Sequence, residues 1–112
     1  MMKKYIPNTG DIIWMDLDPT LGKEQQGRRP VLVITDASYN QFGLCITLPI
    51  SSKIKGYNTE VKLPTKMQTE GVILTNHPRS HDWMIRNIKF IESLDGEIFQ
   101  SVKIRLKVLL GL

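Results

Sequence analysis

Pro30-Val31-Leu32-Val33-Ile34-Thr35 decides the fold class, because this stretch is apolar at both odd and even positions. Successive side chains of a strand point to opposite faces. A strand that is apolar on both faces is typical of the buried centre of a sheet. We therefore expect the remaining chain to supply strands on both sides of it.

Short apolar runs broken by Gly, Pro, Asn and Ser occur on both sides of this stretch. In the run before it, Ile12 and Trp14 share one face with Asp16, while Ile13, Met15 and Leu17 share the other. Pro49 has no backbone donor, so it marks a strand end or a sheet edge. The predicted strands are residues 10–17, 30–35, 44–50, 59–63, 71–75 and 84–91. Their spacing, with turn residues between them, predicts a small barrel or sandwich.

The hydrophobic period becomes helical only near the C-terminus. Ile98, Val102, Leu106 and Leu109 recur at helical spacing between Asp95 and Leu110, and Ser93 or Asp95 is available as the N-cap. A single further turn of helix is expected over residues 37–41. The predicted architecture is mainly β, a small barrel closed by one amphipathic C-terminal helix.

Length and composition predict one globular domain over residues 1–112. The 41% hydrophobic and 23% charged fractions exclude a disordered tail or a disulfide scaffold. Cys45 is the only cysteine and lies in an apolar run, which indicates a buried reduced thiol and a reducing compartment. No apolar core follows the basic start of the chain, and no run approaches the ~18 residues of a membrane span, so a cytoplasmic protein without membrane contact is expected. The net charge of +4 permits nucleic-acid binding without requiring it.

Two loops concentrate polar groups. The first, residues 18–30, is long for a connection between neighbouring strands, and it places Arg29 directly before the buried strand, on a rigid base. The alternative is that Arg28 and Arg29 are solvated and that Glu24 pairs with one of them. The second loop, residues 51–58, combines hydroxyls, two lysines and a tyrosine, which suits single-stranded nucleic acid but equally suits a solubilising surface.

The segment from His77 to Trp83 contains residue types found in metal sites and catalytic triads. Their spacing supports neither kind of site. A His77–His81 pair would need a helix to bind zinc, and Pro78 disfavours one. Neighbouring residues such as Ser80, His81 and Asp82 rarely form a catalytic triad, and no nucleophile elbow accompanies them. Trp14 and Trp83 are interpreted as packing residues and not as base-stacking groups.

An ordered set of motifs covers nearly the whole chain. It comprises Gly10-Asp11-Ile12-Ile13-Trp14, Asp18-Pro19-Thr20, Glu24-Gln25-Gln26-Gly27 with Arg29-Pro30, Pro49-Ile50-Ser51-Ser52, Gly71-Val72 and the closing amphipathic helix. In order and spacing this set resembles the MazF/PemK/Kid family of toxins.

The resemblance implies a homodimeric SH3-like barrel that cleaves single-stranded RNA, including mRNA, within short sequences. Cleavage would proceed by attack of the substrate's 2′-hydroxyl, leaving a cyclic phosphate and a 5′-hydroxyl, with neither metal nor cofactor. The resemblance also implies a cognate antitoxin whose acidic disordered tail competes with RNA for a basic groove.

The resemblance also assigns the catalytic residues. Arg29 matches the family's catalytic arginine, and its donor fork suits two phosphate oxygens. Ser51 stands where relatives usually carry a threonine, whose methyl would restrict the rotamer. Glu24 matches an acidic position and is interpreted as the proton acceptor or as the partner that orients Arg29.

Two departures from the family favour a mechanism centred on Arg29 and Ser51. Lys23 and Asn76 stand where some relatives carry histidine and aspartate, and asparagine does not titrate. Both are therefore assigned to RNA binding or base selection. The predicted RNA contacts are Lys23, Gln26, Arg28, Ser52, Lys53, Lys55, Asn76 and Arg79.

Two rival functions stay open at this point. The CcdB toxins, which act on DNA gyrase, share the barrel, although they lack the Glu-Gln-Gln-Gly and Arg-Pro arrangement. A catalytically weakened RNA-binding module is the second rival, suggested by Ser51 and Asn76.

Overall fold

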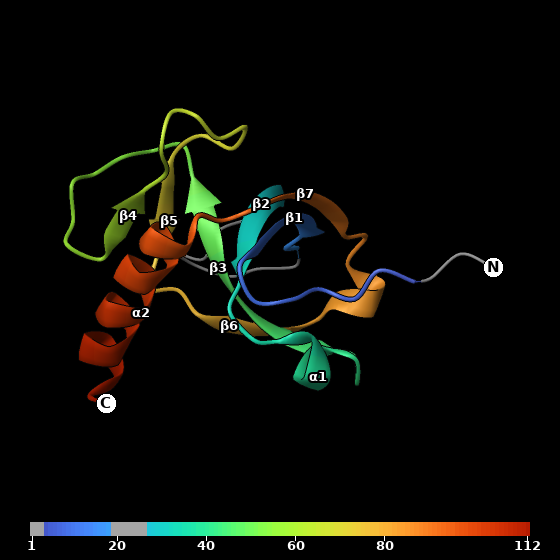
Figure 1. Ribbon diagram of the computed structural model, residues 1–112. Helices are drawn as coiled ribbons and strands as arrows, with labels where there is room; N and C mark the ends of the chain where they lie inside the picture. The colour runs from blue at the N-terminus through green and yellow to red at the C-terminus, as the bar shows by residue number, and fades with distance from the viewer. Residues whose placement is uncertain (1–3, 19–26) are drawn as a thin grey trace.

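The described residues form a seven-stranded antiparallel sheet, and the apolar stretch that begins at Pro30 belongs to one of its inner strands (Figure 1). The structure, a computed structural model, describes residues 4–18 and 27–112. The elements in chain order are β1 (Asp11–Asp16), β2 (Arg28–Val33), α1 (Ala37–Asn40), β3 (Leu44–Ser51), β4 (Glu60–Lys62), β5 (Val72–Leu74), β6 (Arg79–Asp82), the 3₁₀ turn η1 (Trp83–Ile85), β7 (Lys89–Ser93) and α2 (Gly96–Leu110).

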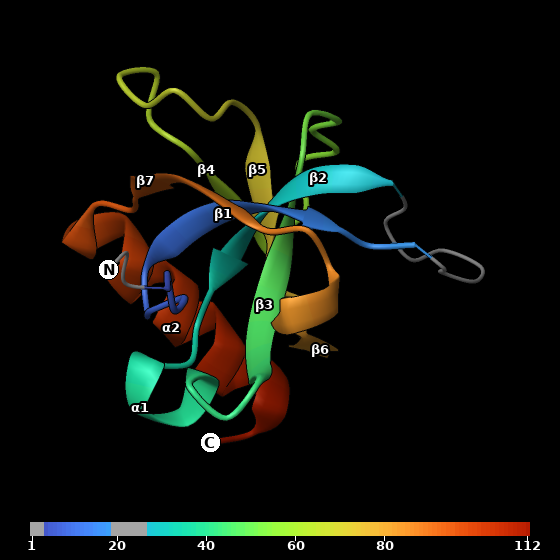
Figure 2. The ribbon, with the colours of Figure 1, turned by 90° about the vertical axis from the view of Figure 1, so that its right-hand side faces the viewer.

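The predicted central strand is confirmed. The strand order is β4-β5-β3-β2-β1-β7, so β2 has β1 on one side and β3 on the other, and β6 also pairs with β3. Val31, Leu32 and Val33 are fully buried. The sheet bends strongly, which gives the predicted barrel-like form with α2 packed beside it (Figure 2).

Two separate hydrophobic cores explain why β2 is apolar at every position. One face of the sheet contributes Ile12, Leu32 and Leu48 to a core that includes Val102 of α2. The other face contributes residues of odd number, among them Ile13 and Val31, to a second core. Because side chains alternate along a strand, each core takes every second residue.

Both predicted helices are confirmed. The carboxylate of Asp95, and not Ser93, caps α2 by accepting a hydrogen bond from the Glu97 N–H at 2.8 Å. Gly111, with a φ of 72°, ends the helix in the left-handed conformation that glycine adopts without strain. Within residues 4–18 and 27–112, no helix is long and apolar enough to cross a membrane.

The predicted strand at residues 84–91 is correct only for residues 89–91. The carboxylate of Asp82 accepts a hydrogen bond from the Met84 N–H and begins the 3₁₀ turn η1. Asn87 has a φ of 51°, which interrupts extended backbone, and β7 starts only at Lys89. The chain forms β6 earlier, in a segment for which the sequence predicts no strand.

Pro49 also differs from its prediction, because it lies within β3 and not at its end. It falls between Thr47, which pairs with β6, and Ile50, which pairs with β5. A residue without a backbone donor fits the position where β3 changes partners on one side.

The packing predictions for Cys45 and Trp83 are confirmed. Cys45 is fully buried, and burial raises the pKa of its thiol to about 12, which keeps it protonated and unreactive. Trp83 is 4% exposed, and its indole N–H donates to the Asn40 carbonyl at 2.8 Å. Trp14 is 38% exposed, so its side chain is only partly packed.

Candidate nucleic-acid and catalytic site

Arg29 and Ser51 lie at the same end of two adjacent strands. β2 and β3 are antiparallel, and their last paired residues toward this end are Val31 and Pro49. Arg29 lies two residues before Val31, and Ser51 lies two residues after Pro49. Side chains two residues apart share a face, so the fold brings these two predicted catalytic residues to one face of the sheet.

The hydroxyl group of Ser51 is held from two sides. The residue is 5% exposed, and its Oγ accepts a hydrogen bond from the Lys53 N–H at 3.1 Å. Gly71, with a φ of +116°, lies directly against the Ser51 backbone, and a Cβ there would lie 2.9 Å from the Ser51 carbonyl carbon. Since the oxygen already accepts from the backbone, the hydroxyl proton is the group that Ser51 offers to a ligand.

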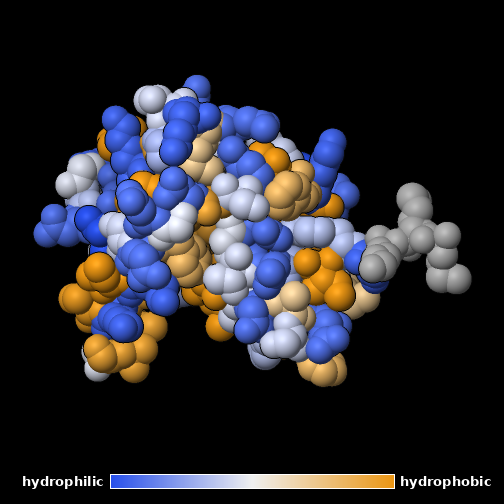
Figure 3. All heavy atoms as spheres, viewed as in Figure 1, coloured by the Kyte–Doolittle hydropathy of each residue, from blue (hydrophilic) through white to orange (hydrophobic). Residues whose placement is uncertain are grey.

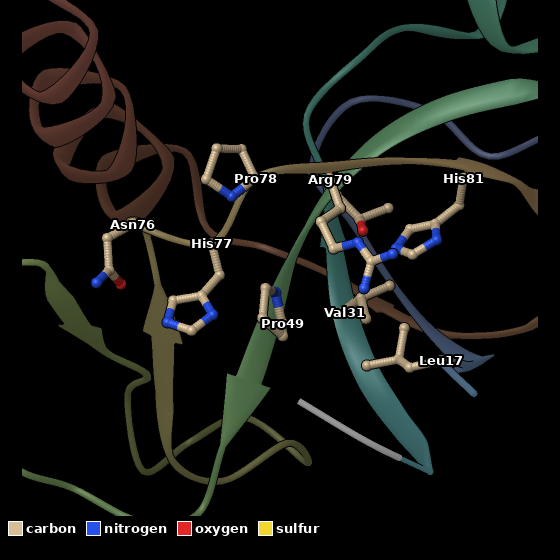
Figure 4. A pocket seen from close by; sticks show the side chains of 9 residues that line it. Leu17, Val31, Pro49, Asn76, His77, Pro78, Arg79 and His81 are labelled. Carbon is tan, nitrogen blue, oxygen red and sulfur yellow. The ribbon is translucent and has the colours of Figure 1, made fainter. Parts of the chain in front are cut away.

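A pocket of about 270 Å³ opens on the same face of the sheet (Figure 4). Its sheet side is formed by Val31 of β2 and by Thr47 and Pro49 of β3. His77, Arg79 and His81, from β6 and the turn before it, complete the wall beside β3. The full lining is Leu17, Val31, Thr47, Pro49, Asn76, His77, Pro78, Arg79 and His81. The pocket therefore combines apolar surfaces with a guanidinium and two imidazoles, a combination that suits a nucleobase next to a phosphate.

Sequence reasoning placed Asn76 and Arg79 at the site but missed His77, His81 and Thr47. Thr47 pairs with Arg79 and Cys45 pairs with His81, so β6 turns its odd-numbered side chains toward the pocket. The alternation His77-x-Arg79-x-His81 is a strand pattern, and it was the signal available in the sequence.

Arg28 lies on the face of β2 opposite to Arg29. Its guanidinium forms an ion pair with Asp16 at 3.0 Å and donates to the Asn87 carbonyl at 2.6 Å. The structure therefore separates Arg28 from the pocket. The predictions for Lys23, Glu24 and Gln26 lie outside the described residues.

The loop after β3 carries the exposed residues Ser52, Lys53 and Lys55. The carboxylate of Glu60 accepts hydrogen bonds from the backbone N–H groups of Lys55, at 3.2 Å, and Gly56, at 2.9 Å. This anchor shapes the loop, and the loop starts at the end of β3 where Ser51 lies beside Arg29. The predicted lysines therefore lie on an exposed loop that begins directly after Ser51.

The comparison with known proteins agrees with this arrangement. The PemK-like, MazF-like toxins of type II toxin-antitoxin systems match residues 8–110. The chain belongs to this family. The ordered motifs in the sequence therefore identified the family correctly.

Individual PemK/MazF members match over nearly the whole chain. The endoribonuclease toxin MazF of Escherichia coli K12 is 37% identical over 112 residues, covering 99% of this chain and 100% of that protein. The crystal structure of MazF (Form-I) from Deinococcus radiodurans superposes with a TM-score of 0.94 at 38% identity, covering 97% and 100% of the two chains. A MazE-MazF complex (Form-II) from the same organism superposes with a TM-score of 0.87 at 34% identity, covering 97% and 99%.

Proposed function

We propose that this PemK/MazF-family protein is an endoribonuclease toxin that cuts single-stranded RNA, including mRNA, and thereby blocks translation. The observation that carries the proposal is the position of Arg29 beside Ser51 on the face that bears the pocket. The curated relatives are named endoribonucleases, which supports the same activity.

Each of the two residues suits one part of a phosphoryl-transfer reaction. In the proposed reaction the substrate's 2′-oxygen attacks the phosphorus, and the bond to the 5′-oxygen breaks. The guanidinium of Arg29 is a planar cation that can donate two parallel hydrogen bonds to phosphate oxygens. Ser51, whose oxygen accepts from the Lys53 N–H, donates its hydroxyl proton to a phosphate oxygen.

Apart from Glu24, the remaining site residues bind RNA in this proposal. Glu24 accepts the 2′-hydroxyl proton or orients Arg29. Arg28 lies on the opposite face of β2, so it contacts only RNA that extends beyond the pocket, in exchange for an exposed ion pair worth about 0–1 kcal/mol. The proposed RNA contacts are Lys23, Gln26, Arg28, Ser52, Lys53, Lys55, Asn76 and Arg79.

The proposed homodimer is supported by the exposed side of α2. Ile104 and Val108, one helical turn apart, are 60% and 79% exposed, and Leu112 beyond the helix is 86% exposed. Orange side chains gather at this end of α2 in the space-filling view (Figure 3). A second copy of the chain would remove this apolar stripe from water.

The proposed antitoxin partner follows from charge. Lys53, Lys55 and Arg79 give the site a positive surface, which attracts an acidic disordered tail as well as RNA. The relatives from Deinococcus radiodurans include MazE-MazF complexes.

Cleavage of a mixed-sequence single-stranded RNA in EDTA tests the nuclease function. Wild-type protein should generate 2′,3′-cyclic phosphate and 5′-hydroxyl ends, because the 2′-oxygen attacks the phosphorus and the 5′-oxygen leaves. Arg29→Ala should lower the rate about 10²–10³-fold, the effect of losing a donor to the developing charge. Lys89→Ala, which removes an exposed cation from β7, is the matched control and should retain the activity. Intact RNA together with inhibition of gyrase would instead support the CcdB-like alternative.

A further inference from the structure

We propose that His77 is a catalytic residue of the RNA cleavage reaction and donates a proton to the departing 5′-oxygen. This inference rests on the proposed endoribonuclease function. The leaving alkoxide is a strong base and needs a proton as the bond to phosphorus breaks. Arg29 and Arg79 are poor donors because guanidinium groups hold their protons at neutral pH, and the Asn76 amide does not titrate. Histidine is the residue type whose unperturbed pKa is near neutral.

His77 is close to Ser51 along the sheet. Ile73 of β5 pairs with Ile50 of β3, so Leu74 is level with Pro49. A turn then follows, in which the His77 N–H donates to the Leu74 carbonyl at 3.2 Å. His77 and Pro49 both line the pocket, and Figure 4 shows their side chains next to each other. Pro49 is two residues from Ser51, or about 7 Å along the strand.

The second histidine of the pocket is too far away for this role. His81 pairs with Cys45, which is six residues before Ser51 on β3, or about 20 Å away along the strand. His81 is also buried, whereas His77 is partly exposed at the pocket. A phosphate held between Arg29 and Ser51 is therefore within reach of His77 and not of His81.

The charged groups around His77 favour the approach of an RNA phosphate. Arg79 and His81 of β6 face the pocket, and Arg29 lies two residues before Val31, the β2 residue that lines it. Neither β3 nor β5 contributes a charged side chain. Among the described residues that line the pocket there is no carboxylate. The two guanidinium groups attract the phosphate toward the pocket wall that carries His77.

In the proposed step, proton transfer from His77 accompanies breakage of the bond between phosphorus and the 5′-oxygen. The 2′-oxygen forms a bond to phosphorus, and its proton passes to a separate base, the role proposed above for Glu24. The bond from phosphorus to the 5′-oxygen breaks, and its electron pair stays on that oxygen. The His77 imidazolium gives its N–H proton to the 5′-oxygen, becomes neutral, and regains a proton from water.

An RNA whose scissile 5′-oxygen is replaced by sulfur tests this role. A thiolate leaves without protonation, so the requirement for a general acid disappears. With ordinary RNA, His77→Ala should cleave about 10²–10⁴-fold more slowly than wild type. With the sulfur-containing RNA its deficit should shrink to less than about tenfold, while that of Arg29→Ala persists on both substrates. His77→Gln, which keeps hydrogen bonding but not proton transfer, should be as defective as His77→Ala on ordinary RNA.

Two further measurements complete the test. The pH–rate profile of wild type should contain a limb that reports the general acid, and His77→Ala should lack that limb. Ser80→Ala, an exposed residue on the other face of β6, is the folding and activity control. Equal cleavage by wild type and His77→Ala, or an equal deficit of His77→Ala on both substrates, would overturn the proposal while the nuclease function stands. Absence of cleavage by wild type would overturn both.

Discussion

Replacing Gly71 by alanine should destabilise the protein and impair the site together. Gly71 precedes β5, has a φ of +116°, and lies against the backbone of Ser51. An alanine there adopts a conformation that L-residues avoid, and its Cβ collides with the Ser51 carbonyl group. Relief of the collision must move Ser51 or Ser52, which are backbone neighbours of the added atom.

The size of the effect follows from two separate costs. The positive φ costs an L-residue about 1–2 kcal/mol. Overpacking against a fixed backbone adds about 1–3 kcal/mol. The sum of about 2–5 kcal/mol is a large fraction of a typical unfolding free energy of about 5–15 kcal/mol.

Gly10→Ala provides a matched control. Gly10 has a φ of +88°, but a Cβ there would meet no atom within 4 Å, so only the backbone cost of about 1–2 kcal/mol applies. Urea unfolding of both variants measures the difference, and an RNA cleavage assay on the folded proteins measures the site. Gly71→Ala should lose at least about tenfold in rate, since a displacement of about 1 Å in a catalytic group can cost about 10²-fold. Equal losses of stability in the two variants, or full activity of Gly71→Ala, would refute this reasoning.

Three more predictions concern single side chains. Ser51→Thr should preserve or raise cleavage, because the added methyl restricts the hydroxyl rotamer; a large loss would show that Ser51 is not the counterpart of the family's threonine. Burial raises the pKa of Glu92, but hydrogen bonds from Thr69 and Gln68 outweigh it and hold that pKa below its ordinary value. The contribution of the Glu92 carboxylate to the stability of the folded protein is therefore present above the unfolded pKa of about 4.3, and it is lost as the pH falls through the lower folded pKa. Glu92→Gln should be less stable than wild type at pH 7. Urea unfolding at low pH should show no difference between the two proteins. Val108→Asp places a charge on the exposed stripe of α2 and should shift the proposed dimer to monomer in sedimentation equilibrium, while the circular dichroism spectrum stays that of the folded protein. An unchanged mass would place the dimer contact elsewhere.

The strands of the two cores could be predicted because their patterns are local. Ile12 and Ile13 are adjacent in sequence and belong to different cores, and an alternating pattern records this directly. The same logic failed at residues 84–91, where the Asp82 cap and the positive φ of Asn87 override an apolar pattern. It also missed β6, whose polar residues pair with the buried strand β3.

The sequence by itself determined the toxin family, the mainly β architecture and the closing helix, because each depends on residue order, period or capping within a short segment. Only the tertiary structure decided that Arg29 lies with Ser51 while Arg28 lies with Asp16 on the opposite face. It alone also brought His77 to Pro49. The physical reason is register: pairing between distant strands is fixed by the packing of both cores, and a shift of one residue would turn every side chain to the other face.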